Sequence, residues 1–188
     1  MRIASLLASS TEIVAALGLT DDLVAVSHCC DWPPQVRTLP ALTSALFEAQ
    51  TAREIDDAVR AKLAGQDAIY ALDAQALAAL KPDLVISQAL CDVCAVSGAE
   101  VSAVLGGLDP QPTLINLEPF SLGDILETIS LIGDAARVSD RAAALRASLQ
   151  ARIDSVAKRT QALPGPQPRT VLLDWTSPPF IGGHWMHE

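Results

Sequence analysis

Short apolar segments alternate with helix-forming segments along most of this 188-residue chain, and this alternation limits the fold more than any other feature. Residues 2–7, 23–27, 84–87 and 113–116 each have the length and apolar content of a buried strand. The segments between them carry apolar residues at helical spacing and often end at glycine. Strands that alternate with helices form parallel sheets with right-handed crossovers. The predicted fold class is therefore α/β, with a parallel sheet and helices on both faces.

Capping patterns mark the starts of the predicted helices. Ser9 with Glu12, and Thr51 with Glu54, each place a hydroxyl three residues before a glutamate, which is the spacing of a capping box. We therefore predict helices that begin just after Ser9 and Thr51, and a short helix capped by Asp73. In this interpretation Glu12 is a capping partner rather than a functional acid.

A long uninterrupted segment follows the predicted sheet. Residues 139–162 contain no Gly or Pro and would extend about 36 Å if fully helical. Three prolines within 164–168 then end the helix, and residues 170–174 are typical of one further strand. The chain is accordingly divided into an N-terminal α/β ligand-binding lobe (1–136), a long connecting helix (137–163), and a linker with the incomplete start of a second lobe (164–188).

The loops that follow the predicted strands define the expected binding edge. In parallel α/β sheets, ligands bind outside the carboxyl ends of the strands. The loops at those ends are residues 9–12, 28–34, 88–96 and 117–120. We expect all four to open on the same edge of the sheet.

All four cysteines lie in two of these loops. Cys29 and Cys30 follow His28 after the second strand, and Cys91 and Cys94 follow the third strand. Two thiol pairs with a nearby imidazole are able to hold zinc or an iron–sulfur cluster, so these five residues are the candidate metal ligands. Redox-active thiols, or inert buried thiols that pack as small hydrophobes, are the alternatives.

Aromatic residues gather near the same loops. Only seven residues are aromatic, and five of them lie just after predicted strands: Trp32, Phe120, Trp175, Phe180 and Trp185. Flat rings at the mouth of a cleft suit a large planar or macrocyclic ligand. The alternative is that such rings merely plug the ends of loops.

Charge and motif content exclude several classes of function. A net charge of −9 argues against nucleic acid as a partner and against docking on anionic lipid. Apolar runs are too short for a membrane span, and the N-terminus lacks the pattern of a signal peptide. The sequence as it stands predicts a cytoplasmic protein, or a periplasmic one if a leader has been removed. We find no phosphate-binding loop, no serine elbow and no nucleophile beside a base, so we expect no enzyme activity.

Five segments resemble one known family. Residues 3–18 (IASLLASSTEIVAALG), 23–34 and 77–86 (LAALKPDLVI) are similar to the iron-siderophore and vitamin B12 type (class III) of ABC-transporter substrate-binding protein. The long helix at 139–162 resembles the single helix that joins the two lobes of that family. The loop at 91–96 resembles a cobalamin-binding branch, here with a cysteine-rich cleft and a truncated C-terminal lobe.

The resemblance implies a non-enzymatic protein that binds a cobalamin-like ligand or an iron chelate. It also implies an ABC permease as partner, although Gln75 stands where many members carry a glutamate that docks on the permease. Combined with the map of strand ends, it places the ligand against six residues: Ser9, Ser10, His28, Trp32, Phe120 and Trp175. Trp32 and Phe120 would stack on the ligand, and His28 or a cysteine would approach its metal. The alternative function is a cytosolic metal, iron–sulfur or thiol-redox protein that uses the two cysteine loops.

Overall fold

A four-stranded parallel sheet forms the centre of the protein. The computed structural model describes residues 1–65, 68–88, 95–166 and 168–182. The strands run in the order β2-β1-β5-β6, and every neighbouring pair is parallel. Their bounds are β1 (Ile3–Ser5), β2 (Leu23–Val26), β5 (Leu84–Ser87) and β6 (Thr113–Asn116). The α/β prediction and the positions of all four strands are confirmed.

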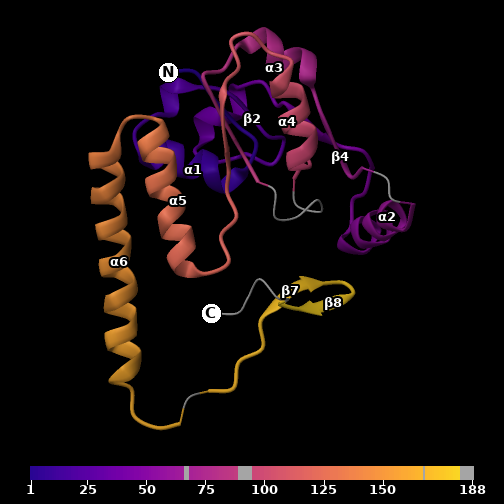
Figure 1. Ribbon diagram of the computed structural model, residues 1–188. Helices are drawn as coiled ribbons and strands as arrows, with labels where there is room; N and C mark the ends of the chain where they lie inside the picture. Colours follow the sequence, from indigo (N-terminus) through magenta and orange to yellow (C-terminus); the bar gives the residue numbers. More distant parts are fainter. Residues whose placement is uncertain (66–67, 89–94, 167, 183–188) are drawn as a thin grey trace.

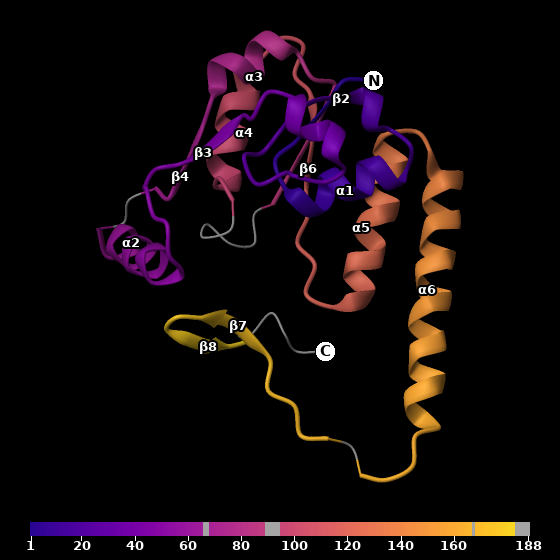
Figure 2. The same ribbon diagram turned by 180° about the vertical axis from the view of Figure 1, so that it is seen from behind.

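Helices cover both faces of this sheet (Figures 1 and 2). Side chains alternate between the faces of a strand, so Ile3, Leu84 and Ile86 enter one core and Ala4 and Val85 enter the other. The first core is closed by α1 (Ala8–Ala16), α5 (Leu122–Ala135) and α6 (Ser139–Gln161), and the second by α3 (Ala74–Leu80) and α4 (Gly98–Gly106). Burial on both faces explains why these strands read as continuous apolar runs.

A second, two-stranded sheet lies beside the first and was not anticipated from the sequence. It pairs β3 (Thr43–Ala45) with β4 (Tyr70–Leu72) in antiparallel register, and α2 (Ala52–Gly65) lies between them in the chain. A single parallel bridge from Val26 to Ala41 joins this region to β2. Three-residue strands carry too little alternation to be recognised, and β3 is polar at two of its three positions. The 3₁₀ helices η1 (Thr20–Asp22) and η2 (Pro34–Thr38) precede and follow β2 in the chain.

The predicted helix caps have two different outcomes. At α2, the Thr51 hydroxyl accepts from the Glu54 N–H at 3.3 Å, and the Glu54 carboxylate accepts from the Thr51 N–H at 3.0 Å, so that capping box is confirmed. At α1 the predicted box is wrong, because the helix begins at Ala8 and Ser9 lies inside its first turn. The helix begins early because Ser10 and Thr11 both bond back to Leu7. The Ser10 hydroxyl donates to the Leu7 carbonyl at 3.0 Å, and the Thr11 backbone N–H donates to the same carbonyl at 3.1 Å, so the chain is helical from Ala8.

The long helix is confirmed and packs on α5. Gly133 of α5 meets Ala142 of α6 so closely that a Cβ at position 133 would overlap the Ala142 Cβ. Nearby, the Arg146 guanidinium pairs with the Glu127 carboxylate and donates to the Ser130 hydroxyl at 2.7 Å. Towards the C-terminal end of α6, the two helices diverge around an apolar groove of about 610 Å³. Its lining residues are Leu122, Ile125, Leu126, Leu149, Arg152, Ile153, Val156 and Ala157.

A hairpin follows the linker after α6. It pairs β7 (Leu173–Thr176) with β8 (Pro179–Ile181), so the strand predicted at 170–174 begins three residues late and has a partner that was not expected. The turn at Ser177 and Pro178 allows the chain to reverse. In both views the hairpin lies beyond the start of α5, on the side towards which the strands of the main sheet end (Figures 1 and 2). None of the helices in the described ranges is long and apolar enough to cross a bilayer.

Candidate functional site

The strand order creates a switch point between β1 and β5. From β1 the chain moves outward to β2, and it later returns to the other side of β1 to form β5 and then β6. Loops that leave β1 and β5 therefore diverge, and ligands of parallel α/β sheets bind in the crevice that such divergence opens. As predicted, all the strands of this sheet end at one edge, which is the candidate site.

A network of buried hydroxyl and thiol groups lies at the end of β1. Ser10 Oγ lies 2.6 Å from Ser5 Oγ, and Thr11 Oγ1 donates to Ser5 Oγ at 2.7 Å. Thr11 Oγ1 also lies 3.1 Å from Cys30 Sγ. The predicted ligand residue Ser10 is fully buried and bonded inward, whereas Ser9 is exposed. The network ties the start of α1 to the loop after β2, so its first role is to hold the edge in shape.

The adjacent cysteines have opposite environments. Cys30 is buried in the core, while Cys29 is exposed. Partial burial, and then the neighbouring Cys30 and Asp31, raise the pKa of the Cys29 thiol. The raised pKa of Cys29 does not favour a reactive thiolate, and burial keeps Cys30 away from solvent. Cys91 and Cys94 lie outside the described residues, and within the described ranges no three His, Cys, Asp or Glu side chains form a group that could hold a metal ion.

His28 is the predicted site residue whose ring is most clearly held at the edge. It follows β2, and its Nδ1 lies 2.7 Å from the hydroxyl of Thr43 on β3. The ring also faces Tyr70 of β4, with centroids 5.4 Å apart. Partial burial lowers the pKa of His28, because desolvation disfavours the imidazolium. Thr43 and Tyr70 were missed as site residues, since both belong to the small sheet that the sequence did not reveal.

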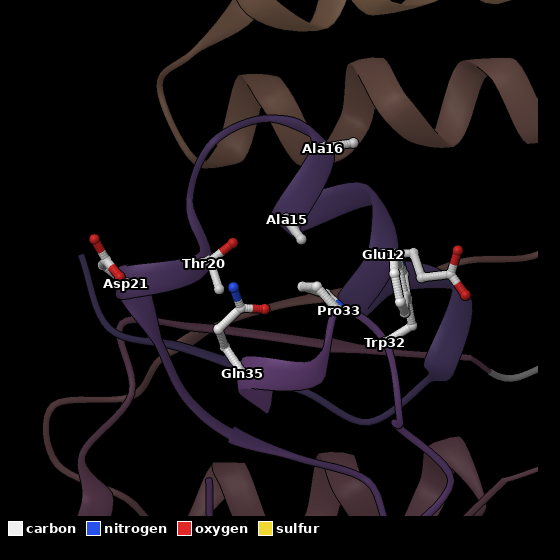
Figure 3. A pocket seen from close by; sticks show the side chains of 8 residues that line it. All are labelled: Glu12, Ala15, Ala16, Thr20, Asp21, Trp32, Pro33 and Gln35. Atoms are coloured by element: carbon white, nitrogen blue, oxygen red, sulfur yellow. The ribbon is translucent and has the colours of Figure 1, made fainter. Parts of the chain in front are cut away.

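Trp32 lines a pocket on the outer flank of α1 rather than the centre of the edge. The pocket is about 480 Å³ in volume, and Figure 3 shows the Trp32 indole lying alongside Glu12. Asp21 and Gln35 lie on its other side. The indole is 58 % exposed, so it is available for stacking. The full lining is Glu12, Ala15, Ala16, Thr20, Asp21, Trp32, Pro33 and Gln35.

The other two predicted aromatic residues differ in how they are held. Phe120 lies in the loop after β6 and is 61 % exposed, although its backbone N–H is fixed by a 3.0 Å bond to the Asp124 carboxylate. Trp175 on β7 is partly buried, and its Nε1–H is shared between the carbonyls of Ala52 at 3.2 Å and Ser177 at 3.0 Å. Its indole therefore fastens the hairpin to the start of α2.

The chain is similar to a known protein family and to several solved structures. A family model described as periplasmic binding protein matches residues 3–186. Among solved structures, the periplasmic heme-binding protein RhuT from Roseiflexus sp. RS-1 is 23% identical with a TM-score of 0.64, over 92% of this chain and 54% of that one. The periplasmic vitamin B12 binding protein BtuF of Vibrio cholerae is 22% identical with a TM-score of 0.64, over 95% of this chain and 57% of that one.

The periplasmic heme-binding protein HutB of Vibrio cholerae is similar at 20% identity and a TM-score of 0.63, over 92% of this chain and 54% of that one. No curated protein matches the chain. At these identities the likeness establishes the fold. The chain spans a little over half the length of each of these three structures.

Proposed function

Because the chain belongs to the periplasmic binding protein family, we propose that it supplies one lobe of a non-enzymatic substrate-binding protein for a cobalamin-like ligand or an iron chelate. The observation that carries this proposal is the strand-end edge. Its outer strands, β2 and β6, are each followed by a loop that presents a ring, His28 after one and Phe120 after the other.

The spacing of these two loops favours a large ligand. Three strand spacings separate β2 from β6, so a ligand that touches both loops must span about 14 Å. A macrocycle or a bulky chelate is of that size, whereas an amino acid or a simple oxyanion is much smaller. Exposed Phe120 offers a face on which a flat ring can stack.

The named relatives support the same class of ligand. Two of the similar structures are named as heme-binding proteins and one as a vitamin B12 binding protein. We propose the periplasm as the location and an ABC transporter as the recipient of the ligand, in keeping with the family. The alternative of a zinc, iron–sulfur or thiol-redox protein has no support within the described residues, where Cys30 is buried and bonded to Thr11.

Titration with two probes tests the proposed function. Purified protein is titrated with cyanocobalamin and with hemin, and absorption and tryptophan fluorescence are followed. We expect a saturable spectral change with at least one probe, and loss of the Phe120 face in Phe120→Ala to weaken binding roughly tenfold. Leu131→Ala is the matched control, since Leu131 is similarly exposed at 51 % but lies far along α5. Absence of a saturable change with either probe at high micromolar concentration would refute the proposal.

Metal analysis separates the alternative function. An anaerobic preparation should contain less than a stoichiometric amount of zinc or iron if the cysteines have no metal role. Stoichiometric metal that disappears in Cys91→Ser/Cys94→Ser protein would favour the alternative instead.

A further inference from the structure

Two hydrogen bonds join His28 to Thr43. The backbone N–H of His28 donates to Thr43 Oγ1 at 3.1 Å, and Nδ1 of the same residue lies 2.7 Å from that oxygen. Thr43 is 6% exposed, so its hydroxyl has little access to water. The threonine hydroxyl therefore already accepts one hydrogen bond, and its own proton needs an acceptor.

Nδ1 of His28 is the acceptor that the geometry provides. Throughout the described ranges, the Thr43 hydroxyl has no bond other than the two to His28. If Nδ1 carried a proton, it and the backbone N–H would both donate to Thr43, and a buried hydroxyl proton would be left without a partner. Buried donors are rarely left in that state. The satisfied arrangement has Thr43 donating to Nδ1, so the neutral imidazole carries its proton on Nε2.

We propose that His28 recognises its ligand as a hydrogen-bond donor through Nε2–H, with Thr43 as the positioning residue that sets this tautomer. This inference rests on the proposed function, and it specifies which kind of chemical group on the ligand His28 contacts at the end of β2. A metal ion needs a nitrogen lone pair, which Nε2 does not have in this tautomer. The group that His28 contacts is instead an acceptor oxygen, such as a peripheral carboxylate or carboxamide of a macrocycle. This differs from the sequence-based expectation that His28 approaches the metal.

The first arm of the test needs no ligand. Histidine ¹⁵N chemical shifts and long-range couplings, measured on ligand-free full-length protein, distinguish the two tautomers, and the His28→Gln spectrum identifies the His28 signals. We expect Nε2–H in the wild type and in Thr43→Ser, which keeps the hydroxyl. In Thr43→Val the Nδ1–H form should become populated. A wild-type His28 that carries its proton on Nδ1 would overturn the proposal.

The second arm separates donation from metal ligation. Glutamine extends an amide N–H to about the place of Nε2–H but is a poor iron ligand. We expect His28→Ala to weaken binding of hemin and of metal-free protoporphyrin IX by a similar factor, roughly tenfold, and His28→Gln to recover most of that loss. Cyanocobalamin serves as the carboxamide probe, and the dimethyl ester of protoporphyrin shows whether a carboxylate is required.

The outcomes distinguish this proposal from the function beneath it. If His28→Ala and His28→Gln both lose hemin binding while metal-free protoporphyrin binds as in the wild type, His28 is a metal ligand and the proposal is wrong. If the wild type binds none of the probes, the proposed function fails, and the ligand half of this inference fails with it. The tautomer half is then still decided by the ligand-free spectra.

Discussion

Substitution of Gly133 by alanine tests how tightly α6 is held against α5. In an ordinary helix this change would stabilise the protein by about 1 kcal/mol, because alanine has the higher helix propensity. Here the new Cβ would lie closer than 3.0 Å to the Ala142 Cβ, whereas carbon atoms in contact lie about 3.5–4.0 Å apart. The obstacle is attached directly to the α6 backbone, and Ala142 is 1% exposed, so neither atom can swing aside.

The helices must therefore separate, and overpacking of this kind costs about 1–3 kcal/mol. Since the neighbour is rigid, we take the upper part of that range, which leaves Gly133→Ala about 2 kcal/mol less stable after the gain in propensity is subtracted. For a chain of this length that corresponds to a fall in Tm of about 4–8 °C. Urea unfolding followed by far-UV circular dichroism measures the free energy directly.

Two further variants make the result decisive. Gly106→Ala in α4 is the matched control, because nothing lies within 4 Å of the Cβ that it would add, and it should be unchanged or more stable by up to about 1 kcal/mol. The double variant Gly133→Ala/Ala142→Gly removes the overlap, so it should be more stable than the sum of its two single changes by about 1 kcal/mol or more. A Gly133→Ala protein as stable as the wild type would refute the close contact between α5 and α6.

Three other predictions follow from local contacts. Ser121→Ala removes the acceptor of the Asp124 N–H at the start of α5 and should lower the free energy of unfolding by about 1 kcal/mol, as measured in urea; an unchanged midpoint would contradict that cap. The pKa of the Asp124 carboxyl is lowered by the Phe120 N–H and then by the Ser121 hydroxyl. The stabilisation from the Asp124 carboxylate is therefore complete above the pKa of the unfolded state and is lost as the pH falls through the pKa of the folded state. Asp124→Asn should therefore flatten the acid side of the plot of stability against pH, below about pH 4. In a Cys91→Ser/Cys94→Ser background, a thiol reagent should modify exposed Cys29 before buried Cys30, and Cys30 should react only at the rate of unfolding; equal rates would contradict the burial of Cys30.

The main sheet and the long helix could be predicted because their signals are local and repeated. β5 is buried at all four positions, Leu114 and Ile115 of β6 pack against opposite cores, and α6 runs from Ser139 to Gln161 without a helix breaker. The start of α1 could not be predicted in the same way. Ser9 and Glu12 satisfy a capping pattern, but the bonds from Ser10 and Thr11 back to Leu7 and Ser5 depend on how β1 ends. Such contacts are formed only in the folded chain.

The location of the candidate site could be predicted from the sequence, but the residues that hold its side chains in place could not. The rule for parallel sheets located the edge on which His28 and Phe120 lie. Thr43, which holds the His28 ring, belongs to a three-residue strand that pairs with β4 across a long helix-containing connection. Nothing near Thr43 in the sequence indicates that pairing. Cys29 and Cys30 are adjacent and could not be distinguished in the sequence. In the folded chain, the side chain of Cys30 is buried in the core, whereas that of Cys29 is exposed to solvent.

α6 is longer than α5, so its C-terminal part extends beyond the helix on which it packs. The 23 residues of α6 extend about 34 Å, while the 14 residues of α5 extend about 21 Å, so about 13 Å of α6 projects past its support. The tight contact between Gly133 and Ala142 lies near the first turn of α6, and it is the point about which α6 would tilt relative to α5. A tilt of only about 5° at that point would displace the far end of α6 by about 2.5 Å. The linker and the hairpin are attached to that end (Figure 1), so a change in the packing of α6 on α5 would act on the hairpin against its other attachment, the bond from Trp175 to the start of α2.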